Sequence, residues 1–457
     1  MDKAPDNEPW ALLCCPSCAG PLEALAAIVC RSCGTRFPRL DGVPWLCADP
    51  DATIGDWRTR LRALTTELEA QAGRYRAALR ADVTRPATRN RLKLMSSACS
   101  DHARRLKTLL APLDVAASAA APESYRALGS PLPAGQGLTS YYANLHRDWC
   151  WGAEENEAAF RAVDMALGGA NPGRTLVVGA GAGRLAYDVH LRRSPTVLLA
   201  ADLNPLMVLV AKRMFAGDHV ELYEFPVAPR DLASHAVLRD LHAPAPALAG
   251  MHLLVADASR APFAAGVFDT VITPWLVDIL DEDFAVFAAR LNQWLKPGGR
   301  WVNSGSLFFQ HQDPERSYST DELGDLVGAA GFGSIELREG SVPYLASPAS
   351  RHARAEGLVT FSALADTRVA APPPRRVAPD WLERDDLPVP RLAQIDSQVL
   401  SMRVHAFVAS LVDGQRTLRE IAAVLVSERL MAADEAQPAV RAFLQRLFTD
   451  AQAPWRP

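Results

Sequence analysis

Short apolar runs alternate with helical stretches in the central part of the chain. The runs occupy residues 175–178, 197–201, 253–256, 268–272 and 300–303. Strands that alternate with helices in this way indicate a mostly parallel sheet with helices on both faces. The pattern predicts an α/β, doubly wound core over residues 136–365.

The preceding segment, residues 51–135, is predicted to be helical. Apolar residues recur there at spacings of three and four, and Pro86 separates one helix from the next. Between Asp56 and Lys107 the chain has 13 Lys and Arg against 5 Asp and Glu. This excess is either the solvated face of a helical hairpin or a docking surface for an anionic partner.

Two Cys-x-x-Cys motifs lie near the N-terminus, with eleven residues between them. They are formed by Cys15 with Cys18 and by Cys30 with Cys33. Such pairs converge on one tetrahedral ion, so the spacing predicts a structural zinc site in residues 1–50. Cys14 is a competing candidate for the first ligand position. The segment resembles the zinc ribbon of the small activator subunit of tRNA and protein methyltransferases, which supports a methyltransferase and performs no chemistry itself.

Composition bounds the class of protein. The 457 residues are 49% hydrophobic and 22% charged, with a net charge of −4, which is typical of a globular chain without a general affinity for nucleic acid. No run reaches the roughly 18 apolar residues of a membrane span. The first residues lack the basic and apolar regions of a secretory signal, so we expect a soluble, cytoplasmic protein.

A glycine-rich turn follows the first strand of the predicted core. Residues 179–185 read Gly-Ala-Gly-Ala-Gly-Arg-Leu, and Asp202 ends the next strand. Glycines at Gly179, Gly181 and Gly183 let the backbone approach a ligand, and an acid at the end of the next strand binds ribose hydroxyls. A nicotinamide cofactor and S-adenosylmethionine both satisfy this pattern.

Three further features favour S-adenosylmethionine. Asp257 ends a third strand, where class I methyltransferases bind the adenine amino group, while residues 268–273 and 295–300 look like their fourth strand and the turn into their fifth. Many class I enzymes have an acid two positions before the first glycine, where this chain has Val177. The resemblance implies a Rossmann-like class I methyltransferase.

Residues 140–362 are also similar to the carnosine N-methyltransferase family. The shared motifs are the glycine loop, the Arg-Asp-Trp at 147–149, and Trp-Val-Asn-Ser-Gly-Ser-Leu at 301–307. The resemblance implies that Arg184 helps to bind the cofactor, with Tyr141 or Tyr142 nearby; we take Tyr142 as the candidate.

The substrate aspartate of that family corresponds to Asp278, the last residue of the segment Trp-Leu-Val-Asp at 275–278. Trp275, which begins this segment, is a candidate for substrate binding. A carboxylate that accepts a hydrogen bond from one imidazole nitrogen fixes the tautomer and stabilises the imidazolium formed when the other nitrogen attacks a methyl group. The alternatives for Asp278 are a helix N-cap and a surface acid.

The remaining substrate positions match the family less closely. A family histidine corresponds to Gln310, with His311 one position later as a candidate catalytic residue. In a later segment where the family uses tyrosines, this chain offers Tyr344 and His352 as substrate-binding candidates, together with Arg351 and Arg354. These departures argue against carnosine itself and leave an imidazole-bearing or carboxylate-bearing substrate.

A proline-rich linker, residues 366–390, leads to a C-terminal segment, residues 391–457. This segment looks like a PqqD-type winged-helix domain, which binds the leader peptide of a ribosomally made product as an added strand on a sheet edge. The alternative is a structural cap or a dimerisation element.

Together these features predict a methyltransferase that depends on S-adenosylmethionine and modifies an imidazole nitrogen of a histidine-containing small molecule or peptide. One alternative is a methyltransferase that modifies another atom of a peptide recruited by the C-terminal domain. The other is a non-enzymatic scaffold that binds a partner through the zinc ribbon and the winged helix.

Overall fold

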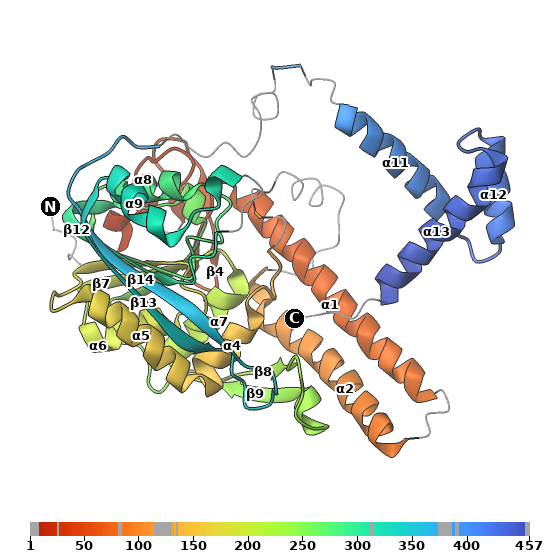
Figure 1. Ribbon diagram of the computed structural model, residues 1–457, viewed down its shortest axis with the longest axis horizontal. Helices are drawn as coiled ribbons and strands as arrows, with labels where there is room; N and C mark the ends of the chain where they lie inside the picture. The colour runs from red at the N-terminus through yellow and green to blue at the C-terminus, as the bar shows by residue number, and fades with distance from the viewer. Residues whose placement is uncertain are drawn as a thin grey trace. The chain divides into compact units, whose positions relative to one another are not determined.

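The computed structural model describes residues 9–24, 27–80, 85–113, 130, 132–133, 136–309, 314–372, 386–388 and 393–452. It divides into two compact units, one up to Arg375 and one over Arg376–Arg456 (Figure 1). No helix in the described residues is long and apolar enough to cross a membrane.

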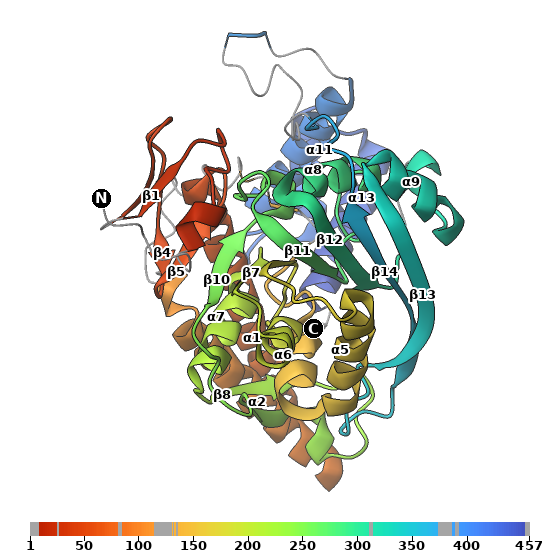
Figure 2. The same cartoon turned by 90° about the vertical axis from the view of Figure 1, so that its left-hand side faces the viewer.

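In the described residues, the first unit is built on a nine-stranded sheet with the order β13-β14-β12-β11-β6-β7-β10-β5-β4 (Figure 2). The strands of the predicted core are β6 (Arg174–Val178), β7 (Val197–Asp202), β10 (Met251–Ala256), β11 (Phe268–Pro274), β12 (Leu295–Gly305), β13 (Phe332–Tyr344) and β14 (Arg354–Ala365). Neighbouring strands from β10 to β12 are parallel, and β14 is antiparallel to both β12 and β13. The strand order reverses between β6 and β11, so the predicted doubly wound fold is confirmed.

Helices cover both faces of this sheet. They are α4 (Tyr142–His146), α5 (Ala153–Leu167), α6 (Arg184–Arg193), α7 (Pro205–Ala216), α8 (Phe284–Trp294) and α9 (Leu323–Ala329). On one face, Val177 packs with Phe160 of α5 and Val189 of α6. On the other face, Val178 belongs to a larger cluster that includes Leu291 of α8. Successive residues of β6 therefore alternate between two cores, as expected for a strand covered on both sides.

The cysteine-rich segment is joined to the central sheet. Its strands are β1 (Leu22–Ala24), β2 (Ile28–Cys30), β3 (Arg36–Phe37), β4 (Arg39–Leu40) and β5 (Val43–Leu46). Trp45 and Leu46 of β5 pair in parallel with Val255 and Ala256 of β10. The predicted ribbon therefore extends the central sheet beyond β10.

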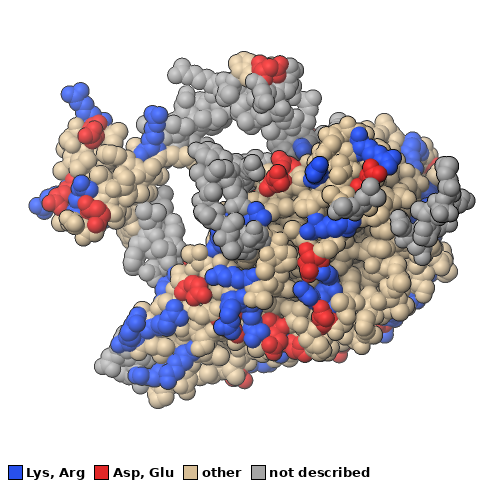
Figure 3. Space-filling view, turned by 180° about the vertical axis from the view of Figure 1, so that it is seen from behind, with Lys and Arg blue, Asp and Glu red and all other residues tan. Residues whose placement is uncertain are grey.

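A helical hairpin follows, formed by α1 (Pro50–Arg80) and α2 (Pro86–Leu109). Its apolar side includes Leu61, Leu68 and Leu106, all fully buried. Lys and Arg side chains gather along its outer surface (Figure 3). The two helices confirm the periodicity in the sequence, and a small hairpin of β8 (Val220–Glu224) and β9 (Val237–Leu241) packs near α2.

Short helical turns connect these elements. They are the π-helix η3 (Arg147–Trp151) and the 3-10 turns η1 (Pro9–Leu12), η2 (Ala111–Leu113), η4 (Ala233–His235), η5 (Ala258–Arg260), η6 (Pro314–Arg316) and η7 (Thr320–Glu322). π-Helical turns of this kind occur frequently at functional sites.

The second unit consists of α11 (Ala393–Ser410), α12 (Leu418–Ser427) and α13 (Ala433–Gln452). Its apolar cluster includes Val408, Leu425 and Val440. Thr417 and Glu420 form a capping box that starts α12 after the Asp413-Gly414 turn. The described part of this unit contains helices and no strand, so the sheet edge expected of a winged helix is not among its described residues.

Candidate active site

A cavity of about 290 Å³ opens at the carboxyl ends of β6 and β11, where the strand order reverses. Ligands bind at this point in doubly wound folds. Among its lining residues are Gly179, Gly181, Arg184, Asp202, Asp257, Trp275, Asp278 and Tyr344. The structure thus brings together eight of the residues that the sequence singled out.

The glycine loop forms one wall of the cavity. Gly179, Gly181 and Gly183 all have positive φ angles, at 72°, 55° and 82°. A β-carbon on Gly179 would lie 2.9 Å from Leu276 and one on Gly183 would lie 2.7 Å from Phe215, whereas one on Gly181 would meet nothing within 4 Å. Gly179 and Gly183 are thus required for packing, while Gly181 leaves the backbone open toward a ligand. Gly183 itself precedes α6 and does not line the cavity.

Two acids stand at the strand ends that face this loop. Asp202 accepts hydrogen bonds from the backbone N–H groups of Gly181 (2.8 Å) and Asn204 (2.9 Å). Burial raises the pKa of Asp202, and these N–H donors oppose that rise. Asp257 accepts from the N–H of Ser259 at 2.8 Å. Both carboxylates are held by backbone donors and line the cavity.

Arg184 lies at the start of α6, over the face of Trp149 at 5.4 Å. It donates to the Asp188 carboxylate (2.9 Å) and to the carbonyl of Asp148 (2.8 Å). The Trp149 indole N–H donates to the carbonyl of Ala182 in the glycine loop at 2.9 Å. The resemblance assigned Arg184 to cofactor binding, and the structure positions it at the loop with its planar group oriented by these contacts.

The opposite wall carries Asp278. Its Oδ2 accepts hydrogen bonds from the Ser306 hydroxyl (2.8 Å) and the Phe308 N–H (2.9 Å). The N-cap of α8 is Asp283, whose side chain accepts from Ala285 and Val286. Asp278 therefore does not cap that helix, and it reaches the cavity wall from the segment after β11.

Aromatic and cationic side chains line the same cavity. Trp275 packs against Tyr344 with ring centroids 5.3 Å apart, and the guanidinium of Arg354 lies 4.6 Å from the centre of the Tyr344 ring. Arg354 also forms an ion pair with Glu356 at 3.0 Å. Arg147 lies on the other side, paired with Asp148 at 2.7 Å.

Backbone strain gathers in this region. Tyr141, Trp275, Leu307 and Leu345 have positive φ angles of 63°, 50°, 51° and 53°, although none is glycine. Tyr141 and Trp275 line the cavity, and Leu307 and Leu345 directly follow its residues Ser306 and Tyr344. Such strain persists where the surroundings fix it and is concentrated at functional sites.

Besides Gly183, other candidates from the sequence are also not placed on the cavity wall. Tyr142 is buried, and its hydroxyl donates to the carbonyl of Tyr223 at 2.8 Å; its neighbour Tyr141 lines the cavity instead. His352 is exposed and does not line the cavity. Gln310 and His311 lie outside the described residues.

The structure adds cavity residues that sequence reasoning missed. Glu155 accepts from the N–H groups of Leu345 (3.0 Å) and Ala346 (2.8 Å), which fixes the chain beside Tyr344. Glu356 lies two residues after Arg354 on β14, and a period-two pattern could have found it. No sequence signal distinguishes Glu155 from the other acids of α5.

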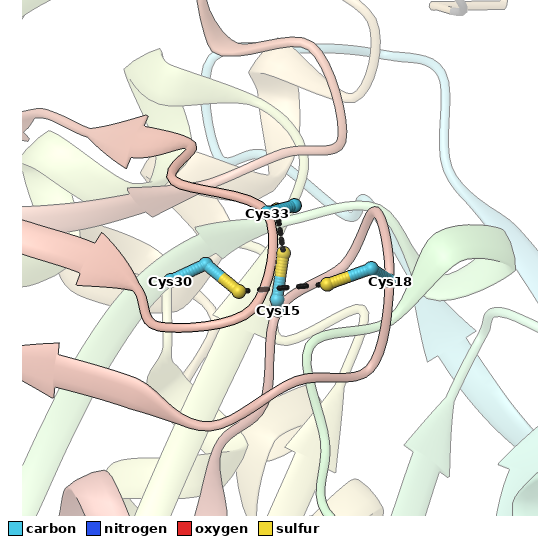
Figure 4. A group of neighbouring side chains, drawn as sticks. All are labelled: Cys15, Cys18, Cys30 and Cys33. Carbon is cyan, nitrogen blue, oxygen red and sulfur yellow. Dashed lines mark hydrogen bonds between the residues drawn. The ribbon is translucent and has the colours of Figure 1, made fainter.

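The four cysteines of the ribbon converge on one point (Figure 4). Cys15 and Cys33 have sulfurs 3.7 Å apart, and those of Cys18 and Cys30 are 3.4 Å apart. Thiolates around a tetrahedral zinc at 2.3 Å lie about 3.8 Å from one another. The hydroxyl and N–H of Thr35 lower the pKa of Cys33 to about 6. The cluster is compatible with a zinc ribbon.

Cys14 lies apart from this group. Its thiol donates to the carbonyl of Phe263 at 3.3 Å. The alternative that Cys14 competes for the first ligand position therefore finds no support in the arrangement of the sulfurs.

Comparison with known proteins gives one family match. Residues 176–302 match the family model described as a methyltransferase domain. No curated protein matches the chain.

Solved structures similar to this chain include Haemonchus contortus phosphoethanolamine N-methyltransferase 2, in complex with phosphomonomethylethanolamine and S-adenosylhomocysteine. It is 15% identical over 50% of this chain and 58% of that chain, with a TM-score of 0.33. A complex of the Haloferax volcanii Trm112 methyltransferase activator with a methyltransferase matches at 14% identity over 51% of this chain and 98% of that chain, with a TM-score of 0.35. The YcgJ protein from Bacillus subtilis matches at 13% identity over 46% of this chain and 98% of that chain, with a TM-score of 0.32.

The strand order, the glycine loop at the point of reversal and the family match define a class I methyltransferase domain. The protein is a methyltransferase.

Proposed function

We propose that this methyltransferase modifies an imidazole nitrogen of a histidine-containing small molecule or peptide. The observation that carries the proposal is the placement of Asp278, whose carboxylate lines the same cavity as Asp202 and the glycine loop. S-adenosylmethionine supplies an electrophilic methyl group, so the acceptor needs an unprotonated nitrogen and no separate base before attack. The task of the protein is to orient the acceptor.

The residues of the loop fit the cofactor. A β-carbon at Gly181 meets nothing within 4 Å, which leaves room for close approach of a ligand to the backbone. Asp202 and Asp257 would hold the ribose and the adenine, and Arg184 would lie near the cofactor carboxylate. The start of α6 adds a helix N-terminus, which favours an anionic group there.

The acceptor would lie beside Asp278. Within the described residues both hydrogen bonds to this carboxylate fall on Oδ2, which leaves Oδ1 as the acceptor for an imidazole N–H. That bond would fix the tautomer and stabilise the imidazolium as it forms. Trp275 and Tyr344 offer flat apolar faces for the ring, and Arg354 offers a cation for a carboxylate on the same substrate.

Replacing Asp278 with asparagine tests this proposal. The asparagine oxygen can still accept from Ser306 and Phe308, which turns the NH₂ group toward the substrate. The NH₂ group donates a hydrogen bond where the carboxylate would accept one, so it favours the imidazole tautomer that cannot attack the methyl group. It also has no negative charge to stabilise the imidazolium. We expect turnover of the histidine-containing acceptor to fall by at least ~10²-fold, with little change in cofactor affinity.

The acceptor is first identified by incubating histidine, its dipeptides and histidine-containing peptides with labelled cofactor. Asp325→Asn, an exposed acid on α9, serves as the matched control and should keep normal turnover. A D278N enzyme that methylates at the normal rate would remove the main support for an imidazole acceptor.

We also propose that the cysteine cluster binds one structural zinc ion. Four thiolates satisfy a tetrahedral zinc and leave no open position, so this ion would stabilise the ribbon and take no part in methyl transfer. A segment this small lacks enough apolar core of its own, and metal binding contributes directly to its folding.

A further proposal concerns the C-terminal unit, which would recruit a substrate through its leader peptide. The unit has its own apolar cluster and forms a separate compact body, as expected of a recognition module. This role is independent of the chemistry at Asp278.

A further inference from the structure

A second group of metal-ligating side chains lies on the β8–β9 hairpin, away from the cysteine cluster. His219 directly precedes β8, Asp240 lies on β9, and His242 directly follows it. Val220 pairs with Leu241 in the antiparallel ladder, so His219 and His242 face each other at the next position. Asp240 lies two residues before His242 and therefore projects to the same side.

The three side chains already converge. His219 Nδ1 lies 2.9 Å from Asp240 Oδ2, and His242 Nδ1 lies 3.5 Å from the same oxygen. One ligand atom from each of the three residues lies within 4.8 Å of the others. Nitrogen and oxygen ligands at 2.0–2.2 Å around a tetrahedral ion are about 3.4 Å apart. The observed spacing is therefore close to the spacing that a bound ion requires.

The two imidazole rings are held side by side. Their centroids are 5.0 Å apart and their planes differ by 22°. The Nδ1 atoms of both rings lie near the same Asp240 oxygen, so one metal ion could be shared by the two imidazoles and the carboxylate.

The backbone at both ends of the hairpin is fixed to neighbouring elements. The N–H of His242 donates to the carbonyl of Trp149 in η3 at 3.2 Å, and the N–H of Asp218 donates to the carbonyl of Arg213 in α7 at 2.9 Å. The three candidate ligands therefore lie on a backbone that hydrogen bonds hold in place at both ends of the hairpin. Their side chains are 65%, 47% and 52% exposed for His219, Asp240 and His242, so an ion from solution can reach them.

We propose that His219, Asp240 and His242 form a surface site for a divalent transition-metal ion of the kind that prefers imidazole, such as Zn²⁺ or Ni²⁺. Two imidazoles and one carboxylate suit these ions, whereas Mg²⁺ and Ca²⁺ prefer sets made of oxygen. Three protein ligands leave at least one position for water or a further ligand. The site is separate from the four-thiolate cluster and from the methyl-transfer cavity.

Equilibrium dialysis of the untagged full-length protein against micromolar Zn²⁺ tests the site. We expect two bound zinc ions per chain, one at the cysteine cluster and one at the hairpin. The double variant His219→Ala/His242→Ala should bind one. His235→Ala, which removes a histidine at the other end of the same hairpin whose Nδ1 contacts the Asp231 carbonyl, is the matched control and should bind two.

Calorimetry with Ni²⁺ on protein that carries zinc at the cysteine cluster alone provides a second readout. The wild-type chain should bind Ni²⁺ and the double variant should not, while Mg²⁺ should give no signal with either. Asp240→Asn should weaken Ni²⁺ binding by at least about 10-fold, because a neutral amide oxygen replaces the charged carboxylate ligand. The proposal would be overturned by a wild-type chain that binds one zinc ion and no Ni²⁺. It would also be overturned by a double variant that still binds two zinc ions and Ni²⁺.

Discussion

At the scale of single residues, the proposed cofactor site would depend strongly on Asp202. Its two oxygens accept from Gly181 and Asn204, so the carboxylate is fixed before any ligand binds. A carboxylate held in this way loses little freedom when ribose hydroxyls donate to it. In the proposed cofactor site, the residue would therefore serve both the shape of the loop and the affinity for the cofactor.

We predict that Asp202→Ala lowers the affinity for S-adenosylmethionine by about 1.5–3 kcal/mol, the range for hydrogen bonds to a charged group. Calorimetry with S-adenosylhomocysteine measures the change. Asp202→Asn keeps an oxygen that can accept from Gly181, so it serves as the conservative comparison. We expect it to lose less cofactor affinity than Asp202→Ala. If Asp202→Ala binds as tightly as the wild-type chain, the cofactor does not lie in this cavity.

A second residue-scale prediction concerns His146. It is fully buried at the end of α4, next to the ring of Tyr142 at 5.1 Å, and burial lowers its pKa to about 3. The unfolded chain binds this proton near pH 6.5. The unfolded state therefore takes up more protons as the pH falls, and the folded state loses stability between pH 6.5 and pH 3.

The expected slope from this residue is about 1.4 kcal/mol per pH unit below pH 6. Urea unfolding of wild-type and His146→Phe protein at pH 7 and pH 5 gives the comparison. His102, with its pKa lowered to about 4 by burial, contributes to the same fall in both proteins. The variant should lose less stability between the two pH values than the wild-type chain, and equal losses would contradict the prediction.

Residues at the site also show where sequence reasoning reaches its limit. Asp202 and Asp257 could be predicted because each ends an apolar strand, and carboxyl ends of parallel strands meet at one edge. Tyr141 could not be separated from Tyr142, because the backbone φ of 63° at Tyr141 decides which of the two rings faces the cavity. Glu155 acts through the backbone of Leu345 and Ala346, a contact across 190 positions that leaves no local pattern.

At the scale of elements, the ribbon and the sheet are one structure. Leu12, Phe37 and Leu46 belong to the same apolar cluster as Phe268 and Leu291 of the methyltransferase core. The two Cys-x-x-Cys motifs predict the ribbon, but the pairing of β5 with β10 has no signature in the sequence. Loss of the metal would thus affect more than the segment that carries the cysteines.

We predict that Cys33→Ser releases the zinc and lowers the thermal stability of the whole first unit. The reason is that a loosened ribbon withdraws β5 from β10 and exposes part of the shared apolar cluster. Elemental analysis should give about one zinc ion at this cluster in the wild-type chain and none there in the variant. Cys14→Ser is the matched control and should retain zinc, because its sulfur lies outside the cluster. A metal-free variant with the same melting temperature as the wild-type chain would contradict this coupling between the metal and the stability of the first unit.

At the scale of the whole molecule, the chain forms two compact units. The first contains the cavity, the cofactor loop and the cysteine cluster, and the second has its own core of three helices. The proline-rich composition between them predicts the boundary. The peptide-binding strand of the second unit stays a prediction, because its described residues form helices alone.

We predict that deleting residues 376–457 spares methylation of free histidine derivatives and reduces kcat/KM for a leader-bearing peptide by at least ~10-fold. The physical reason is that recruitment raises the effective concentration of the tethered substrate at the cavity. Initial rates with both substrates, in the full chain and the deletion variant, give the comparison. Equal rates on the peptide would assign the unit a structural role.

The parallel pairing of β5 with β10 has a consequence for synthesis on the ribosome. Trp45 and its register partner Val255 lie 210 positions apart, so translation at 5–20 residues per second separates their emergence by roughly 10–40 s. During this interval the N-terminal segment has left the ribosome without its neighbouring strand. A metal ion bound by the four thiolates in that time would keep the N-terminal segment folded until β10, the strand that pairs with β5, has been synthesised.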